Sequence, residues 1–389
     1  MERWKAMNLA GIMIPFALSS FSVFSISMIV QPLSIFLRVP ISVIFAAIPI
    51  DFIGGAIGGL VLGYVADRMG RKPVMLIAII LFSAPLFLAA ISTNLIEIFA
   101  LWFVIGFGVN AQNGVSYPVV VETLQHSTGT MGGLLQSLYF AGFLLDSLAS
   151  IAFPYWRTFL IACGIIALVP SIAFSIAIRE TRKGGLIRYS IRSMRGKLAV
   201  YTVAFSAVVA GAFMFSVPLM GVVPTYLREI DASSTTIVFF SLIGLSFFII
   251  SGYLSDRVGR GAVAAIFSSL CILSGTLLFV EKVPLYSLFI IAFMYASSGF
   301  FSFSGIWVSE NYPAEYRVTA TNIVFFTGRI IGGFSPLIAS VSFVFLGKGI
   351  AFVGMIAGAM ALTGVILLFL FGQSFRGGAK VQKNLNNIH

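Results

Sequence analysis

The chain has 389 residues, of which 59% are hydrophobic and only 10% are charged, and its net charge is +11. A soluble core cannot bury so much apolar surface, so the composition excludes a soluble globular protein and indicates a polytopic membrane protein. Crossing the hydrocarbon layer takes about 20 apolar residues. Twelve segments qualify: 8–36, 41–66, 74–92, 95–121, 130–152, 156–178, 198–227, 235–254, 261–279, 284–308, 318–345 and 350–372.

A charged nonapeptide occurs twice, each time between two apolar segments. Residues 63–71 read GYVADRMGR, and residues 252–260 read GYLSDRVGR, 189 positions later. Glu122 and Glu310 end the fourth and tenth segments and lie 188 positions apart. These repeats indicate a duplicated chain in which each nonapeptide forms a short loop. We predict an all-α membrane protein with 12 transmembrane helices in two pseudo-symmetric six-helix bundles, with alternating access to a site between them.

Basic residues set the expected domain limits and orientation. The predicted parts are an N-terminal bundle (1–178), a basic linker (179–197), a C-terminal bundle (198–375) and a tail (376–389). With both termini in the cytoplasm, eighteen Lys and Arg lie in cytoplasmic segments and five in outer loops, as the positive-inside rule requires. We expect a multi-pass plasma-membrane protein that contacts lipid. The positive charge follows from this topology and indicates no nucleic-acid partner.

Two motifs resemble a known family. The pattern Gly63-x-x-x-Asp67-Arg68-x-Gly70-Arg71, between the second and third helices, resembles the signature of the major facilitator superfamily. The sequence from Glu310 to Arg317, E-x-x-P-x-x-x-R, resembles the segment after the tenth helix in its sugar, organic-ion and sialate or lactate symporters. The resemblance implies cytoplasmic charge clusters that hold the two halves together. The gate residues that this resemblance implies are Asp67, Arg68, Gly70, Arg71, Glu122, Asp256, Arg257, Gly259, Arg260, Glu310 and Arg317.

Three charged side chains lie well inside predicted spans, away from the span ends: Asp51, Asp146 and Arg329. A charge costs about 2.5–3.5 kcal/mol at mid-depth. In the family fold the fifth helix adjoins the eighth, which offers Asp146 no cation. A carboxyl in such surroundings favours its protonated form and can carry a proton. Asp146 and Asp51 are therefore the candidate proton sites. The family fold packs the second helix against the eleventh, so Arg329 either pairs with Asp51 or binds a substrate carboxylate.

Polar residues within the spans are candidates for substrate binding. Asn110, Asn113 and Tyr117 recur at helical spacing on the fourth helix, which lines the cavity in the family. Asn322 lies seven residues before Arg329 on the same helical face. The alternative for all of these residues is hydrogen bonding between helices. Further candidates are Gln31, Gln112, Gln136, Tyr139 and Tyr295.

The sequence thus favours proton-coupled symport of a small organic anion, such as a carboxylate or sugar acid. The alternative on the same fold is an uncoupled facilitator or exchanger of sugars or other small metabolites. The two histidines lie in a loop and at the terminus, and no nucleotide-binding motif occurs. We therefore expect no enzymatic activity, no catalytic residue, no metal and no cofactor, with the proton gradient as driving force. We also expect a monomer.

Overall fold

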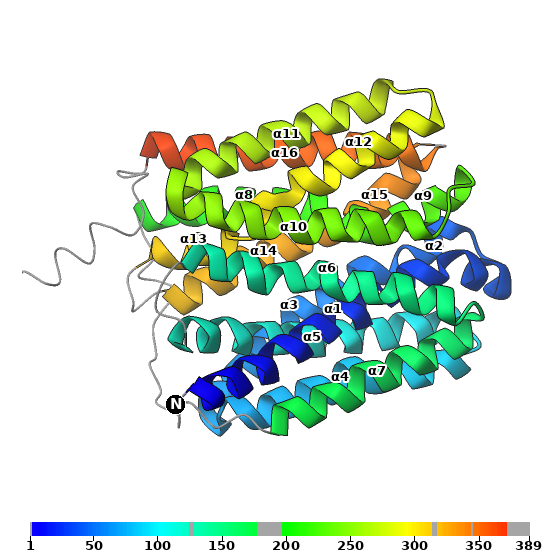
Figure 1. Ribbon diagram of the computed structural model, residues 1–389, viewed down its shortest axis with the longest axis horizontal. Helices are drawn as coiled ribbons and strands as arrows, with labels where there is room; N and C mark the ends of the chain where they lie inside the picture. The colour runs from blue at the N-terminus through cyan, green and yellow to red at the C-terminus, as the bar shows by residue number, and fades with distance from the viewer. Residues whose placement is uncertain (1, 124–127, 177–196, 313–316, 344, 372–389) are drawn as a thin grey trace, which may run out of the picture.

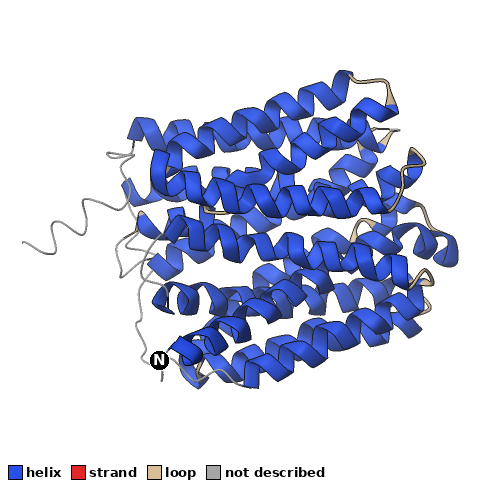
Figure 2. Cartoon of the chain, in the orientation of Figure 1, coloured by secondary structure: helices blue, strands red, loops and turns tan. Residues whose placement is uncertain are grey.

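A computed structural model describes residues 2–123, 128–176, 197–312, 317–343 and 345–371. This part of the chain is helical, with short turns and no strand (Figure 2). It contains twelve spans that are long and apolar enough to cross a membrane. The prediction of an all-α protein with twelve transmembrane helices is confirmed. The predicted linker lies outside the described residues except for Lys197, and the tail lies wholly outside them.

The helices form two halves, and in Figure 1 the first half lies below the second. The first half comprises α1 (Glu2–Leu37), α2 (Ile41–Ile44), α3 (Ala47–Met69), α4 (Arg71–Ile91), α5 (Leu95–Thr123), α6 (Thr128–Ala152) and α7 (Trp156–Ile176). The second half comprises α8 (Lys197–Gly221), α9 (Val223–Glu229), α10 (Thr235–Val258), α11 (Arg260–Val280), α12 (Pro284–Ser297), η2 (Ser298–Phe301), α13 (Ser304–Glu310), α14 (Arg317–Gly333), α15 (Ser335–Val341) and α16 (Leu346–Phe371).

The repeated nonapeptides are helical up to a single glycine, so the expectation of a loop across each nonapeptide was wrong. The α3 helix ends at Met69 and α4 begins at Arg71, so Gly70 alone forms the turn. Gly70 has φ 97° and Gly259, at the matching position between α10 and α11, has φ 107°. Glycine adopts these angles without a side-chain clash. One residue therefore reverses the chain at each of these turns. Arg68, Arg71, Arg257 and Arg260 flank the two turns, so we call this end of the molecule the basic end.

Four of the predicted continuous spans are interrupted. The second is divided at Phe45 and Ala46 into α2 and α3. The seventh ends at Gly221, and the chain continues in the short helix α9, which has Pro224 in its first turn. The tenth passes through η2 between α12 and α13. The eleventh breaks at Phe334, before α15 and its Pro336. The backbone N–H groups of the first turn have no partner within the helix, so a proline there costs no helix hydrogen bond and suits a new helix start.

Two helix crossings make most of the contact between the halves. The α6 helix packs on α10, and α3 packs on α14, which are the matching pairs of a duplicated fold (Figure 1). At the first crossing, a Cβ added to Gly252 would lie 2.9 Å from the Cα of Gly133. At the second, a Cβ on Gly333 would lie 2.5 Å from the Cβ of Phe52. Small residues let the helices approach closely at both crossings.

Candidate functional site

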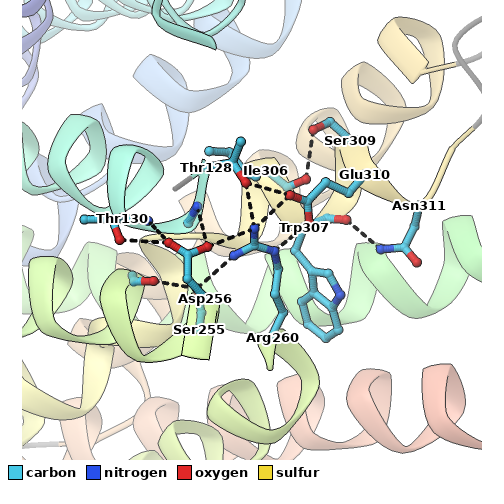
Figure 3. Close-up of polar contacts among 12 residues, drawn as sticks. Thr128, Thr130, Ser255, Asp256, Arg260, Ile306, Trp307, Ser309, Glu310 and Asn311 are labelled. Carbon is cyan, nitrogen blue, oxygen red and sulfur yellow. Dashed lines mark hydrogen bonds and ion pairs between the residues drawn. The ribbon is translucent and has the colours of Figure 1, made fainter. Parts of the chain in front are cut away.

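The basic end carries a polar network that begins with Arg260 and Glu310 (Figure 3). Arg260 is the first residue of α11, and Glu310 is the last residue of α13. The Nε of Arg260 donates to Oε2 of Glu310 at 2.6 Å, and its Nη2 donates to Oε1 at 2.7 Å. This two-point geometry is the strong form of an arginine–carboxylate contact. It fixes the guanidinium at the surface that meets the first half.

Asp256 connects the second half to the first at the N-terminus of α6. Its Oδ1 accepts from the backbone N–H of Gly129 at 2.9 Å. Its Oδ2 accepts from the N–H and the hydroxyl of Thr130, both at 2.8 Å. The first N–H groups of a helix have no partner inside it, and the helix dipole favours an anion there. The carboxylate is therefore well placed to hold α6 against α10.

Thr128 completes the junction from the first half. Its hydroxyl donates to Oε1 of Glu310 at 2.9 Å and accepts from Nη2 of Arg260 at 2.9 Å. Together with the three bonds to Asp256, these contacts make five hydrogen bonds of the described residues that cross between the halves here. Of the three charged residues only Arg260 is nearly buried, so the network lies at a wet boundary where its bonds can open and close.

Sequence reasoning placed Asp256, Arg260 and Glu310 in a gate but missed Thr128 and Thr130. The signal in the sequence is Thr-Gly-Thr at 128–130, because threonine and glycine are common where a helix begins. The motif residues drew attention because they repeat, whereas the start of α6 carries no repeated charge.

The other gate candidates surround this network or lie outside the described part of the chain. Arg68 and Arg257 are exposed and stack on Tyr64 and Tyr253, at 4.3 and 4.4 Å from the ring centres. Arg71 begins α4. The side chains of Asp67, Glu122 and Arg317 lie outside the described structure, and with them the matching cluster of the first half.

Asp146 lies deep inside the first half. Its side chain is fully buried, and among the described residues neither carboxyl oxygen has a hydrogen-bond partner. One turn earlier, a Cβ on Gly142 would lie 2.7 Å from the backbone N of Phe21, so this face of α6 packs on α1. The carboxyl also acts electrostatically on the thiol of Cys163 in α7. Asp146 therefore faces the interior of its own half, away from the α6–α10 crossing.

Asp51 and Arg329 belong to α3 and α14, the helices of the other crossing. The Oδ1 of Asp51 lies toward α5, 2.7 Å from where a Cβ on Gly106 would be. Asp51 is 2% exposed, and the positive charge of Arg329 acts on its carboxyl. The guanidinium lies over Phe213 and Phe325, 5.8 and 5.5 Å from the ring centres. Asp51 Oδ1 has no hydrogen-bond partner within the described structure. The electrostatic interaction between Arg329 and Asp51 crosses from one half to the other, and two aromatic rings flank the guanidinium.

The candidate polar stripe on α5 is described at one of its three positions. Asn110 is nearly buried, and its amide donates to the carbonyl of Gly106 at 3.4 Å. A Cβ on Gly55 of α3 would collide with that amide. Asn110 thus lies in the α3–α5 contact. The side chains of Asn113 and Tyr117 lie outside the described residues.

The remaining candidates do not gather in one place. Gln112 donates to Ser116 within α5 at 3.4 Å. The ring of Tyr139 packs on Phe16, and the hydroxyl of Tyr295 donates to the carbonyl of Leu219. Gln31 and Asn322 are exposed, and Gln136 is buried. Among the described residues, no group of three or more His, Cys, Asp or Glu is placed to hold a metal ion.

The fold and the junction between its halves define a membrane transporter. The family model described as Major Facilitator Superfamily matches residues 8–336, so the chain belongs to that family. The sialic acid transporter NanX of Escherichia coli (strain K12) is 24% identical over 320 residues, which cover 78% of each chain. A gallate transporter of Pseudomonas putida is 26% identical over 382 residues, covering 83% of this chain and 82% of its own.

Solved structures agree with this assignment at the level of the fold. The crystal structure of a D-xylose–proton symporter superposes with a TM-score of 0.75 at 17% identity, covering 97% of this chain and all of that one. The nucleoside transporter NupG gives a TM-score of 0.70 at 15% identity, covering 95% of this chain and all of that one. The protein is therefore a multi-pass membrane transporter of small molecules, and the expectation that it is not an enzyme is confirmed by its family.

Proposed function

We propose that the protein couples the movement of a small organic anion to the movement of a proton by alternating access. The observation that carries proton coupling is Asp146, a fully buried carboxyl whose two oxygens have no hydrogen-bond partner among the described residues. An ionised carboxylate in apolar surroundings is costly unless it is paired, whereas the neutral acid is tolerated. Such a group can take up a proton in one state of the transporter and release it in another.

Two features support an anionic substrate. Relatives similar to this chain are a sialic acid, a gallate and a niacin transporter, and all three compounds carry a carboxylate. Arg329 lies inside the membrane at the junction of the halves, where a planar guanidinium suits two-point binding of a carboxylate. Because the charge of Arg329 also acts on the carboxyl of Asp51, substrate and aspartate can compete for the same cation.

The alternative is uncoupled movement of a neutral metabolite on the same fold. It is favoured by a further relative, the minor myo-inositol transporter IolF of Bacillus subtilis (strain 168), 22% identical over 387 residues. In that case Asp146 and Asp51 are structural.

The basic end is proposed to face the cytoplasm of the plasma membrane, with both termini on that side. Arg68, Arg71, Lys72, Arg257 and Arg260 all lie at this end, as the positive-inside rule requires. The network around Asp256 then closes the cytoplasmic side when the halves meet. We also propose two bundles with the limits 1–178 and 198–375. The proposed protein is a monomer that uses no cofactor and binds no nucleic acid.

The test is uptake of labelled carboxylates and neutral sugars into proteoliposomes with an inward proton gradient. Asp146→Asn is expected to abolish accumulation that depends on the gradient and to leave exchange counterflow intact, since the amide cannot carry a proton. Ser137→Ala is the control, because it removes a hydrogen-bonding hydroxyl from the same helix at another level. Gradient-driven accumulation that is unchanged in Asp146→Asn would remove this residue as the proton site.

A further inference from the structure

A cavity of about 270 Å³ opens at the end of the bundle opposite to the basic end. The end of α6, the start of α7 and the outer part of α1 form most of its wall, and Arg228 of α9 contributes from the second half. Met28, Gln31 and Ser150 line it. A water molecule occupies about 30 Å³ in the liquid and needs polar partners, so this volume holds several waters.

The floor of the cavity lies one helical turn from Asp146. On α6, Ser150 lines the cavity and Asp146 is four residues deeper, about 6 Å along the axis at 1.5 Å per residue. On α7, which runs in the opposite direction, Phe159 lines the cavity and Cys163 is four residues deeper. The carboxyl of Asp146 acts electrostatically on the thiol of Cys163, and α6 and α7 pack on each other, so both residues lie beneath the floor.

The α1 helix, the third wall of the cavity, places Asp146 at the same level. The α1 and α6 helices run in the same direction from the basic end, and Gly142 packs on Phe21. The ring of Phe143 lies 6.1 Å from that of Phe24. Asp146 therefore lies between the level of Phe21 and that of Met28, which lines the cavity. All three surrounding helices place the carboxyl directly below the same opening.

We propose that protons reach Asp146 through this cavity, along a path that opens beside α9 and then runs inside the first half, separate below its opening from the substrate route between the halves. The inference rests on the proposed proton coupling and names the route that it uses. Phe159, 1% exposed at the floor, separates the cavity from the carboxyl layer and is the place where water must enter. A separate path lets the proton load while substrate occupies the junction.

The charged and titratable groups around this route are few. The Asp146 carboxyl acts on the thiol of Cys163 in α7, and α1 and α10 have no ionisable residue at this level of their sequences. At the opening, Arg228 donates to the carbonyl of Met28 at 2.9 Å, and burial lowers the pKa of its guanidinium. Arg157 stacks on Phe36 and Trp156, 4.9 Å from each ring centre. The Arg228 bond joins the two halves, so the opening changes when they separate.

The test uses Ser150→Cys in right-side-out membrane vesicles treated with a membrane-impermeant methanethiosulfonate reagent. The native Cys163 and Cys271 are fully buried, so treated wild type gives the baseline. Modification is expected to abolish proton-driven accumulation and to preserve counterflow, because it fills the cavity and leaves the junction of the halves open. Phe153→Cys, also in the lining, is the second variant if Ser150→Cys does not fold. Tyr155→Cys, exposed in the same turn outside the lining, is the matched control.

Three results would overturn the path. They are a Ser150→Cys variant whose thiol the reagent does not reach, modification that leaves accumulation intact, and modification that stops counterflow as well. The last would place the cavity on the substrate route. Failure of the proposed function looks different, because untreated wild type then shows no accumulation that a protonophore abolishes. Wild-type accumulation with an insensitive Ser150→Cys removes this inference alone.

Discussion

Asp256→Asn tests how strongly the network at the basic end holds the halves together. The carboxylate accepts three hydrogen bonds from α6, one at Oδ1 and two at Oδ2. An asparagine keeps the two contacts of one oxygen and turns an amide N–H toward the donor of the other. Loss of one hydrogen bond to a charged group costs about 2 kcal/mol, which corresponds to about a 30-fold shift toward the separated state.

Spin labels on either side of the junction measure this shift. Met69 ends α3 in the first half and Val258 ends α10 in the second, with exposures of 62% and 59%. With cysteines at both positions, pulsed electron paramagnetic resonance reports the distance between the halves. Asp256→Asn is expected to enlarge the population with the longer distance.

Arg257→Gln is the matched control for this measurement. Arg257 is the next residue, and it stacks on Tyr253 of its own helix. Its substitution removes a charge from the same turn without breaking a bond between the halves. Equal distance distributions in Asp256→Asn and wild type, or an equal shift in both variants, would refute the reasoning.

Three further predictions concern backbone geometry and substrate binding. Gly58→Ala should lower the thermal unfolding midpoint, because its Cβ would lie 2.2 Å from the carbonyl oxygen of Phe107, whereas Gly63→Ala, with no atom within 4 Å, should not. Gly259→Ala should cost about 1–3 kcal/mol, since φ is 107° there, and an unchanged unfolding midpoint would contradict this. Arg329→Lys should weaken binding of carboxylates and leave neutral sugars unaffected, as measured by competition for uptake, because lysine lacks the two-point geometry.

The sequence was sufficient for the fold because the relevant signals are long. Twelve apolar segments and two copies of one motif predict twelve helices in two halves, and each is read from many residues. The details at single residues were harder. A charged nonapeptide resembles a loop in composition, yet helix continues to Met69 because one glycine suffices to reverse the chain.

The site was predicted less completely, and the reason is physical. Asp256 can be recognised in the sequence because its motif is repeated. Its partners are backbone N–H groups, and which ones they are depends on which helix starts beside it. Asn110 illustrates the reverse case. Helical spacing put it on a polar stripe, but the direction of that stripe depends on the neighbouring helix, and the amide packs against Gly55. Spacing predicts which residues share a face and not what that face meets.

The most direct test of the central claim measures proton movement itself. Proteoliposomes with an entrapped pH-sensitive dye receive a polar sugar acid, which crosses bare lipid slowly, in the absence of an imposed gradient. The account predicts acidification of the interior that requires the protein, is absent with a neutral sugar and is lost in Asp146→Asn. Entry of labelled acid without any change of internal pH would contradict proton-coupled transport.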